Sequence, residues 1–187
     1  MKCFLLALFF ANFALAANPV VVMDTNMGEI EIELNQEKAP NTVTNFLKYV
    51  DDKFYDGTIY HRVIPSFMIQ GGGFTEKMQE KPTRAPIQNE AANGLKNEIG
   101  SIAMARTSDP HSATAQFFIN VNENTSLDHS TTTTMGYGYA VFGKVTKGMH
   151  VVNRIKMVKT GRVSGFDDVP MDTVLIKSVK RKAAVKK

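Results

Sequence analysis

The sequence predicts a mainly β protein, closed as a barrel or packed as a sandwich. Eight segments carry β-type patterns, and only two have apolar residues at helical spacing. Parallel βαβ winding would need a helix between most strands, and those helices are missing. Eight strands with few helices therefore indicate a sandwich or a closed barrel, in which closure removes the exposed sheet edges.

The elements follow in order along the chain. Segments 20–23 and 29–34 are expected strands around a turn at 25–28, and the second alternates glutamates with apolar residues. A helix is expected from Pro40 to about Asp52, because proline suits a first helical position and apolar residues recur at helical spacing behind it. Segment 75–98 lacks periodicity and is expected to be a long loop. Further strands are expected at 60–64, 67–70, 101–106, 116–121, 139–145 and 173–179, and a second helix at 147–157.

Residues 1–16 are predicted to be a secretory signal peptide. Lys2 precedes an apolar run from Cys3 to Leu15, and Ala14-Leu15-Ala16 has the small-x-small pattern of a cleavage site. The run is too short to span a bilayer. Cleavage would remove the only cysteine of the chain, which excludes thiol catalysis and thiolate metal sites in the mature protein. We therefore expect an exported protein.

The net charge of +4 is concentrated at the carboxyl end. Without Lys2 and the basic residues from Lys177 onward, acidic residues outnumber basic ones, so no specific nucleic-acid partner is expected. We predict a folded domain at 17–179 and a basic tail at 180–187. The tail could make weak contact with an anionic surface, or it could simply be solvated, as most terminal charge runs are.

The side chains that could form a functional site lie on three expected strands. Alternate side chains of a strand point to opposite faces, so Gln116 and Phe118 share one face, and Met68 and Gln70 share another. If these strands are neighbours, they form with Arg62 a shallow apolar pocket rimmed by hydrogen-bond donors. The same pattern also fits a surface arginine with a carboxylate partner and core packing of the apolar residues, so both interpretations stay open.

Other kinds of site find little support. His61 is expected to be a packed, hydrogen-bonded structural residue, and the remaining histidines have no metal-like spacing. No nucleophile elbow, Walker loop or dinucleotide fingerprint is present. Neither a metal nor a cofactor is therefore expected.

At these residues the sequence resembles the cyclophilins, which are peptidyl-prolyl cis-trans isomerases. The resemblance rests on YHRVIPSFMIQGG at 60–72, GSIAMAR at 100–106, AQFFI at 115–119 and YAVFGKV at 139–145. It runs from about residue 20 to 179, in order, and is closest to exported, periplasmic bacterial members. It implies a closed eight-stranded antiparallel β-barrel capped by two α-helices, and an enzyme that isomerises X-Pro bonds in folding exported proteins.

The resemblance also implies the roles of individual residues. Arg62 would be catalytic and would donate a hydrogen bond to the prolyl nitrogen, while Gln70 would bind the substrate carbonyl. The remaining substrate-binding residues would form the proline pocket and the adjoining groove: Phe67, Met68, Phe118, Leu127, Ala105, Arg106, Gln116 and Tyr139. Partners would be proline-containing segments of unfolded or folding proteins, and the protein would act as a monomer.

Ser126 departs from the family pattern. Related proteins often carry tryptophan or phenylalanine there, and this chain contains no tryptophan at all. The resemblance therefore implies weak cyclosporin binding. It also leaves open a second interpretation, in which the same barrel is a non-catalytic proline-peptide-binding or chaperone module.

Overall fold

The computed structural model describes residues 17–183, and the predicted signal peptide at 1–16 lies outside them. No helix in the described part is long and apolar enough to cross a membrane. The elements in chain order are β1 (Val20–Thr25), β2 (Gly28–Leu34), α1 (Pro40–Asp51), β3 (Thr58–Ile64), β4 (Met68–Thr75), η1 (Ala91–Asn93), β5 (Ser101–Met104), β6 (Phe117–Asn120), η2 (Thr125–Leu127), β7 (Val141–Lys147), α2 (Met149–Ile155), β8 (Thr160–Val163), β9 (Phe166–Pro170) and β10 (Leu175–Arg181).

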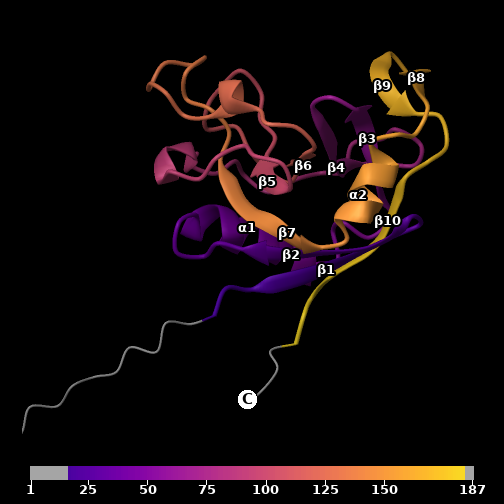
Figure 1. The fold of residues 1–187 in the computed structure, drawn as a ribbon, viewed down its shortest axis with the longest axis horizontal. Coiled ribbons are helices and arrows are strands. Elements are labelled where there is room, and N and C mark those ends of the chain that lie inside the picture. Colours follow the sequence, from indigo (N-terminus) through magenta and orange to yellow (C-terminus); the bar gives the residue numbers. More distant parts are fainter. Residues whose placement is uncertain (1–16, 184–187) are drawn as a thin grey trace, which may run out of the picture.

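Eight of these strands close into an antiparallel barrel, which confirms the predicted fold class. Their order around the barrel is β1-β10-β3-β4-β6-β5-β7-β2, and β2 closes the ring by pairing with β1. Figure 1 shows β1 and β10 running side by side although they stand at opposite ends of the sequence. Closure leaves no open edge on these strands.

The barrel interior and both helices share one hydrophobic core. Phe46 of α1 is fully buried, with its ring centroid 5.1 Å from those of Tyr55 and Phe142 and 5.9 Å from that of Phe117. Val152 of α2 belongs to the same cluster. The helical spacing in the sequence thus marks faces that pack on the strands, and both predicted helices are present, with α2 shorter at each end than expected.

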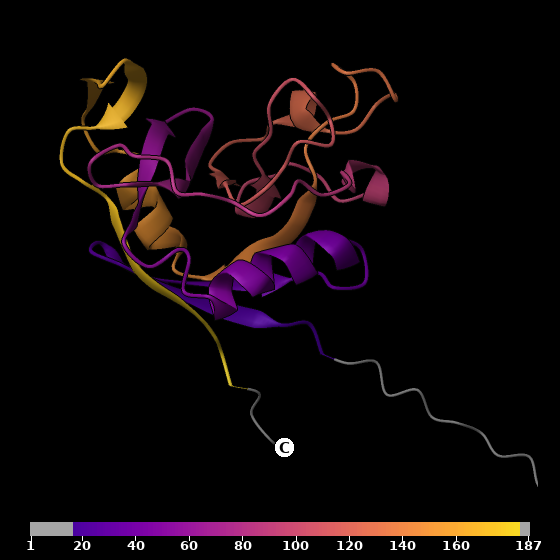
Figure 2. The same cartoon turned by 180° about the vertical axis from the view of Figure 1, so that it is seen from behind.

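A two-stranded hairpin, β8-β9, was not among the predicted elements. It forms a separate sheet beside β3 and projects from one corner of the molecule (Figures 1 and 2). Its strands are short and only partly buried, so apolar alternation is weak. The Ser164-Gly165 dipeptide, which has positive φ values of 52° and 86°, was the one local turn signal available.

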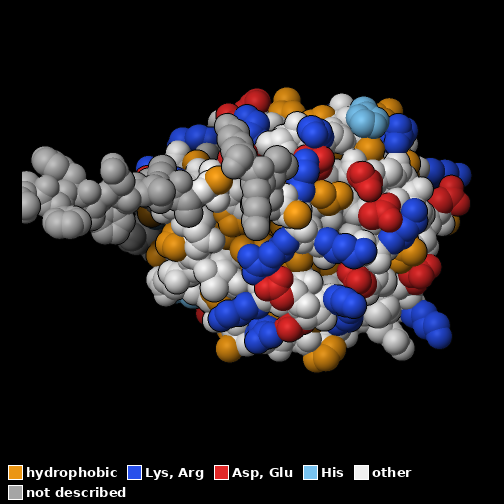
Figure 3. Space-filling view, turned by 90° about the horizontal axis from the view of Figure 1, so that it is seen from below, with side chains coloured by type: hydrophobic (Ala, Val, Ile, Leu, Met, Phe, Trp, Pro, Cys, Tyr) orange, Lys and Arg blue, Asp and Glu red, His pale blue; other side chains and the backbone are white. Residues whose placement is uncertain are grey.

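The carboxyl end is built into the barrel further than expected. β10 continues to Arg181, two residues past the predicted domain end at 179, and pairs with β1 as far as Val21. Lys177, Arg181 and Lys182 form ion pairs with acidic residues of the barrel and α1, at 3.7, 2.6 and 2.8 Å. On the face shown in Figure 3, basic and acidic side chains are interleaved. These pairs reduce the charge available to an anionic surface.

Candidate active site

The candidate site lies on the outer face of adjacent strands β3, β4, β6 and β5. Arg62 is the register partner of Gln70, Gln70 is also paired with Phe118, and Phe118 is paired with Ala103. Phe117 and Ile119 point inward to the main core, as the alternation predicted. The opposite faces of these strands therefore meet outside the barrel, where Met68, Phe118 and Val141 form a second apolar cluster.

A cavity of about 200 Å³ opens above this cluster. Its volume suits one small ring rather than a drug-sized ligand. Every predicted site residue except Gln116 lines it: Arg62, Phe67, Met68, Gln70, Ala105, Arg106, Phe118, Leu127 and Tyr139. The structure thus brings together residues that are as much as 77 positions apart in the chain (62 to 139), as the family resemblance implied.

Gln116 lies in the neighbouring cavity, which Gln70 and Arg106 also line. Its Oε1 accepts a hydrogen bond of 3.0 Å from Nε2 of Gln70, and its own Nε2 donates to Glu80 at 3.2 Å. These two hydrogen bonds link Gln70, Gln116 and Glu80, and they orient the Gln70 amide at the boundary between the two cavities. One N–H and the carbonyl of Gln70 remain for a ligand.

Arg62 presents a half-exposed guanidinium to the cavity. Within residues 17–183 its one ion-pair partner is Asp168, whose Oδ2 lies 3.8 Å from Nε. Both Nη atoms are therefore left to bind a ligand. Sequence reasoning anticipated a carboxylate partner for this arginine without identifying it, because Asp168 comes from the unpredicted hairpin.

Arg106 lines the cavity in a different way from Arg62. Its guanidinium donates to the backbone carbonyls of Gly138, Thr107, Ser108 and Thr134 at 3.0, 2.9, 3.4 and 3.3 Å, and it lies 4.6 Å from the centroid of the Tyr139 ring. These bonds tie the loop after β5 to the loop that precedes Tyr139. Arg106 thus shapes the groove wall, and its polar atoms are largely committed to the protein.

Ser126 lies on η2 and is exposed. It does not line the cavity, whereas its neighbour Leu127 does. The edge of the pocket at this point consequently carries no aromatic ring, as the departure from the family pattern predicted.

His61 precedes Arg62 on β3 and does not line the cavity. It is buried and packs on Phe74 with ring centroids 4.6 Å apart, which confirms its packed position. The expectation that it would be fully hydrogen-bonded is wrong, because Nδ1 is buried without a partner. Burial, and secondarily the positive charge of Arg62, lowers its pKa to about 4. The imidazole is therefore neutral at physiological pH.

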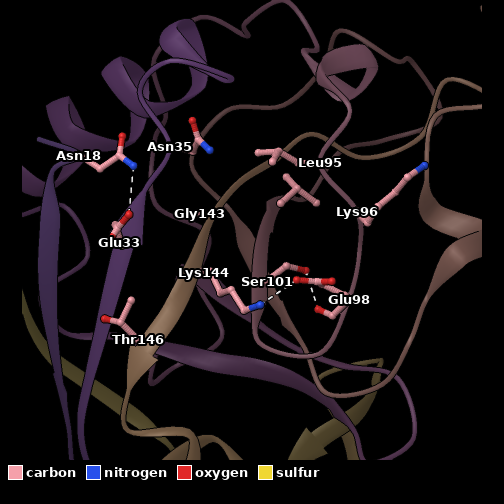
Figure 4. Close-up of a pocket in the computed structure, with 11 residues that line it drawn as sticks. Asn18, Glu33, Asn35, Leu95, Lys96, Glu98, Ser101, Gly143, Lys144 and Thr146 are labelled. Carbon is pink, nitrogen blue, oxygen red and sulfur yellow. Dashed lines mark hydrogen bonds and ion pairs between the residues drawn. The ribbon is translucent and has the colours of Figure 1, made fainter. Parts of the chain in front are cut away.

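A larger cavity of about 280 Å³ lies between β2, β7 and the segment before β5 (Figure 4). Two polar pairs within its lining are already made: Asn18 donates to Glu33 at 3.0 Å, and Lys144 pairs with Glu98 at 2.8 Å. Across the described residues, no three side chains of His, Cys, Asp or Glu gather closely enough to hold a metal ion. The cavity that combines an apolar floor with a half-exposed guanidinium is thus the best candidate site.

The fold and the site together define a small closed β-barrel with an outer pocket that combines apolar side chains and a half-exposed arginine. Residues 20–181 match the family model "Cyclophilin type peptidyl-prolyl cis-trans isomerase/CLD", so the chain belongs to the cyclophilin family. It is similar to peptidyl-prolyl cis-trans isomerase cyp18 of Streptomyces antibioticus, with 61% identity over 86% of this chain and 96% of that protein. It is also similar to peptidyl-prolyl cis-trans isomerase B of Escherichia coli, with 55% identity over 86% of this chain and 98% of that protein.

Solved structures agree on the fold. A cyclophilin type isomerase of Cryptosporidium parvum, determined in the presence of the dipeptide Ala-Pro, superposes with a TM-score of 0.72 at 24% identity, over 88% of this chain and 99% of that one. Both bacterial relatives are peptidyl-prolyl cis-trans isomerases, and this chain is an enzyme of that class.

Proposed function

We propose that this protein accelerates rotation about X-Pro bonds by holding the proline ring in the cavity beneath Arg62. Rotation is opposed by amide resonance, with a barrier of about 18–20 kcal/mol. In the twisted amide the prolyl nitrogen recovers its lone pair and becomes a hydrogen-bond acceptor. A catalyst therefore needs a donor at that nitrogen and a fixed ring, and no covalent intermediate.

Arg62 supplies the donor. Its half-exposed side chain lines the cavity, and guanidinium stays charged at any physiological pH. A donor that is in place before the nitrogen becomes basic stabilises the transition state more than the planar ground state. The half-exposed guanidinium that lines a cavity with an apolar floor is the observation that carries this proposal.

The apolar floor supplies the second requirement. Met68 and Phe118 are 2% and 3% exposed, so their side chains are held in place by packing before any ligand binds. Phe118 and Tyr139 meet edge to face, with ring centroids 5.7 Å apart. A proline ring would rest on this floor while Gln70 binds a neighbouring carbonyl of the peptide.

A protease-coupled assay with a proline-containing peptide tests the mechanism. Removing one preorganised donor typically costs on the order of a hundredfold in rate, so Arg62→Ala should lose about that much of kcat/KM. Arg84→Ala is the matched control, since Arg84 is also a half-exposed arginine with one aspartate partner but lies outside the cavity. Equal activity of Arg62→Ala and wild type would refute the mechanism, and low, equal rates in both would favour the non-catalytic peptide-binding module.

We also propose that the substrates are exported proteins and that the enzyme works in the bacterial periplasm. The support is the amino-terminal pattern of Lys2, an apolar run and Ala14-Leu15-Ala16. Fractionation of bacteria producing the full chain should recover a protein that starts at Ala17. A charged substitution in the apolar run, Leu6→Lys, should retain the uncleaved protein in the cytoplasm. Cytoplasmic, uncleaved wild-type protein would overturn the assignment.

A further inference from the structure

We propose that Asp168 is a positioning residue for Arg62, supplied by a strained bulge in the β8-β9 hairpin. The proposal rests on the catalytic role proposed for Arg62. Asp168 lies on β9, outside the barrel and far along the chain from every residue of the cavity. Its Oδ2 nevertheless lies 3.8 Å from Nε of Arg62.

The backbone of the hairpin is irregular at this residue. Gly161 pairs with Val169 and Val163 pairs with Phe166, so β9 has one more residue than β8 between the two pairs. Such a bulge re-aims a side chain that regular alternation would point elsewhere. Asp168 has a φ of +60°, a left-handed conformation that is uncommon outside glycine and that aspartate and asparagine tolerate best. A strained backbone that presents a functional group is typical of active sites.

The hairpin is anchored on both sides of the bulge. At its tip, the Phe166 ring packs against Phe74 with centroids 5.3 Å apart, and Phe74 belongs to barrel strand β4. At its base, the backbone N–H of Met171 donates to the carbonyl of Lys159 at 2.9 Å. Between these points β9 lies against β3, the strand that carries Arg62. The carboxylate is thus held by the same framework as the catalytic strand.

The contact selects one orientation of a flexible side chain. Arg62 is half-exposed, and a free arginine would sample many rotamers. A carboxylate at Nε favours rotamers that leave both Nη atoms directed to the cavity, where the prolyl nitrogen would lie. Both side chains are more than 40% exposed, and an ion pair of this kind adds little to stability. The expected effect is therefore on rate and not on folding.

The test is the isomerase assay on Asp168→Asn, because asparagine keeps the shape and tolerates the same backbone conformation while removing the charge. Asp167→Asn is the matched control: Asp167 is the neighbouring residue and pairs with Arg162 at 3.7 Å, on the same hairpin. We expect Asp168→Asn to lower kcat about tenfold with little change in KM, as misplacement of a reacting group does. Urea unfolding midpoints of both variants should match that of wild type.

The double variant Arg62→Ala/Asp168→Asn separates this inference from the proposed mechanism. If Asp168 acts through Arg62, its substitution should have no further effect once Arg62 is absent. Full activity of Asp168→Asn alongside a strong loss in Arg62→Ala would overturn the inference alone. An additional loss in the double variant would overturn it as well, since Asp168 would then act independently. Full activity of Arg62→Ala would overturn both.

Discussion

Acid should destabilise this protein through His61 as the pH falls from about 6.5 toward 4, a range that begins above the pH at which carboxylates titrate. The pKa of His61 is about 4 in the folded protein, against an ordinary value of 6.5, because burial disfavours the charged ring. The unfolded chain therefore binds more protons than the folded one between these two values. Stability is consequently full above about pH 6.5 and falls as the pH drops toward 4.

The magnitude follows from the displacement of the pKa. Each unit corresponds to about 1.4 kcal/mol, so His61 should remove about 2 kcal/mol of unfolding free energy between pH 7 and 5, and about 3 kcal/mol by pH 4. If the unfolding free energy falls by about 2 kcal/mol per molar urea, the loss of about 2 kcal/mol between pH 7 and 5 lowers the urea midpoint by about 1 M. The loss is large beside the total stability of an ordinary domain, about 5–15 kcal/mol.

Urea unfolding of wild type, His61→Phe and His150→Phe at pH 7, 6 and 5 measures the effect. Phenylalanine fills the site without titrating, so any packing cost shifts the His61→Phe midpoint equally at every pH. His150 is exposed on α2, and its substitution should leave the pH dependence unchanged. We expect a nearly flat midpoint between pH 7 and 5 in His61→Phe alone. If that variant loses as much stability as wild type over this range, the reasoning about His61 is refuted.

Three further substitutions test the surroundings of the site. Gly72 has a φ of +82°, and a Cβ there would lie 2.6 Å from the Phe117 side chain. Gly72→Ala should therefore lower the unfolding free energy by about 2–3 kcal/mol in urea unfolding. Gly165→Ala, where φ is also positive but the space is open, should lower it by about 1 kcal/mol. Arg106→Lys keeps the charge, but lysine cannot reach all the carbonyl partners of the arginine. Amide hydrogen exchange should therefore quicken severalfold in residues 134–138, while the barrel strands stay protected. Unchanged exchange would contradict the role of Arg106 as a clamp between the two loops. Ser126→Trp should restore an aromatic edge and tighten cyclosporin binding at least tenfold by calorimetry; equal affinity would show that this edge is not what limits binding.

Alternation along single strands predicted the mainly β class and four of the residues that line the cavity, Arg62, Met68, Gln70 and Phe118. The closed barrel and the other lining residues were implied by the family resemblance. Phe117 and Phe118 illustrate the alternation, since one faces the core and its neighbour faces the cavity, as their positions in the sequence indicated. Strand neighbours needed the family resemblance, because alternation does not say which strands pair.

The features that were missed depend on contacts between distant segments. The bulge that turns Asp168 toward Arg62 lies in a hairpin with little apolar alternation, and nothing local distinguishes Asp168 from Asp167. The clamp made by Arg106 uses backbone carbonyls of loops, which carry no residue signal. Likewise, the sequence predicts that Arg181 belongs to the basic tail, because its partner, Asp51, lies 130 positions earlier and leaves no local signal.

The position of β10 between β1 and β3 has a consequence for how the chain acquires its structure. β1 precedes the other seven barrel strands in the chain and must wait for β10, the last of them, before both of its sides are paired. Until then the growing chain carries an unpaired strand edge, which is a template for pairing with other chains. Pairings across such separations also slow folding. The barrel can therefore close only after β10, the last of its eight strands in chain order, has been made.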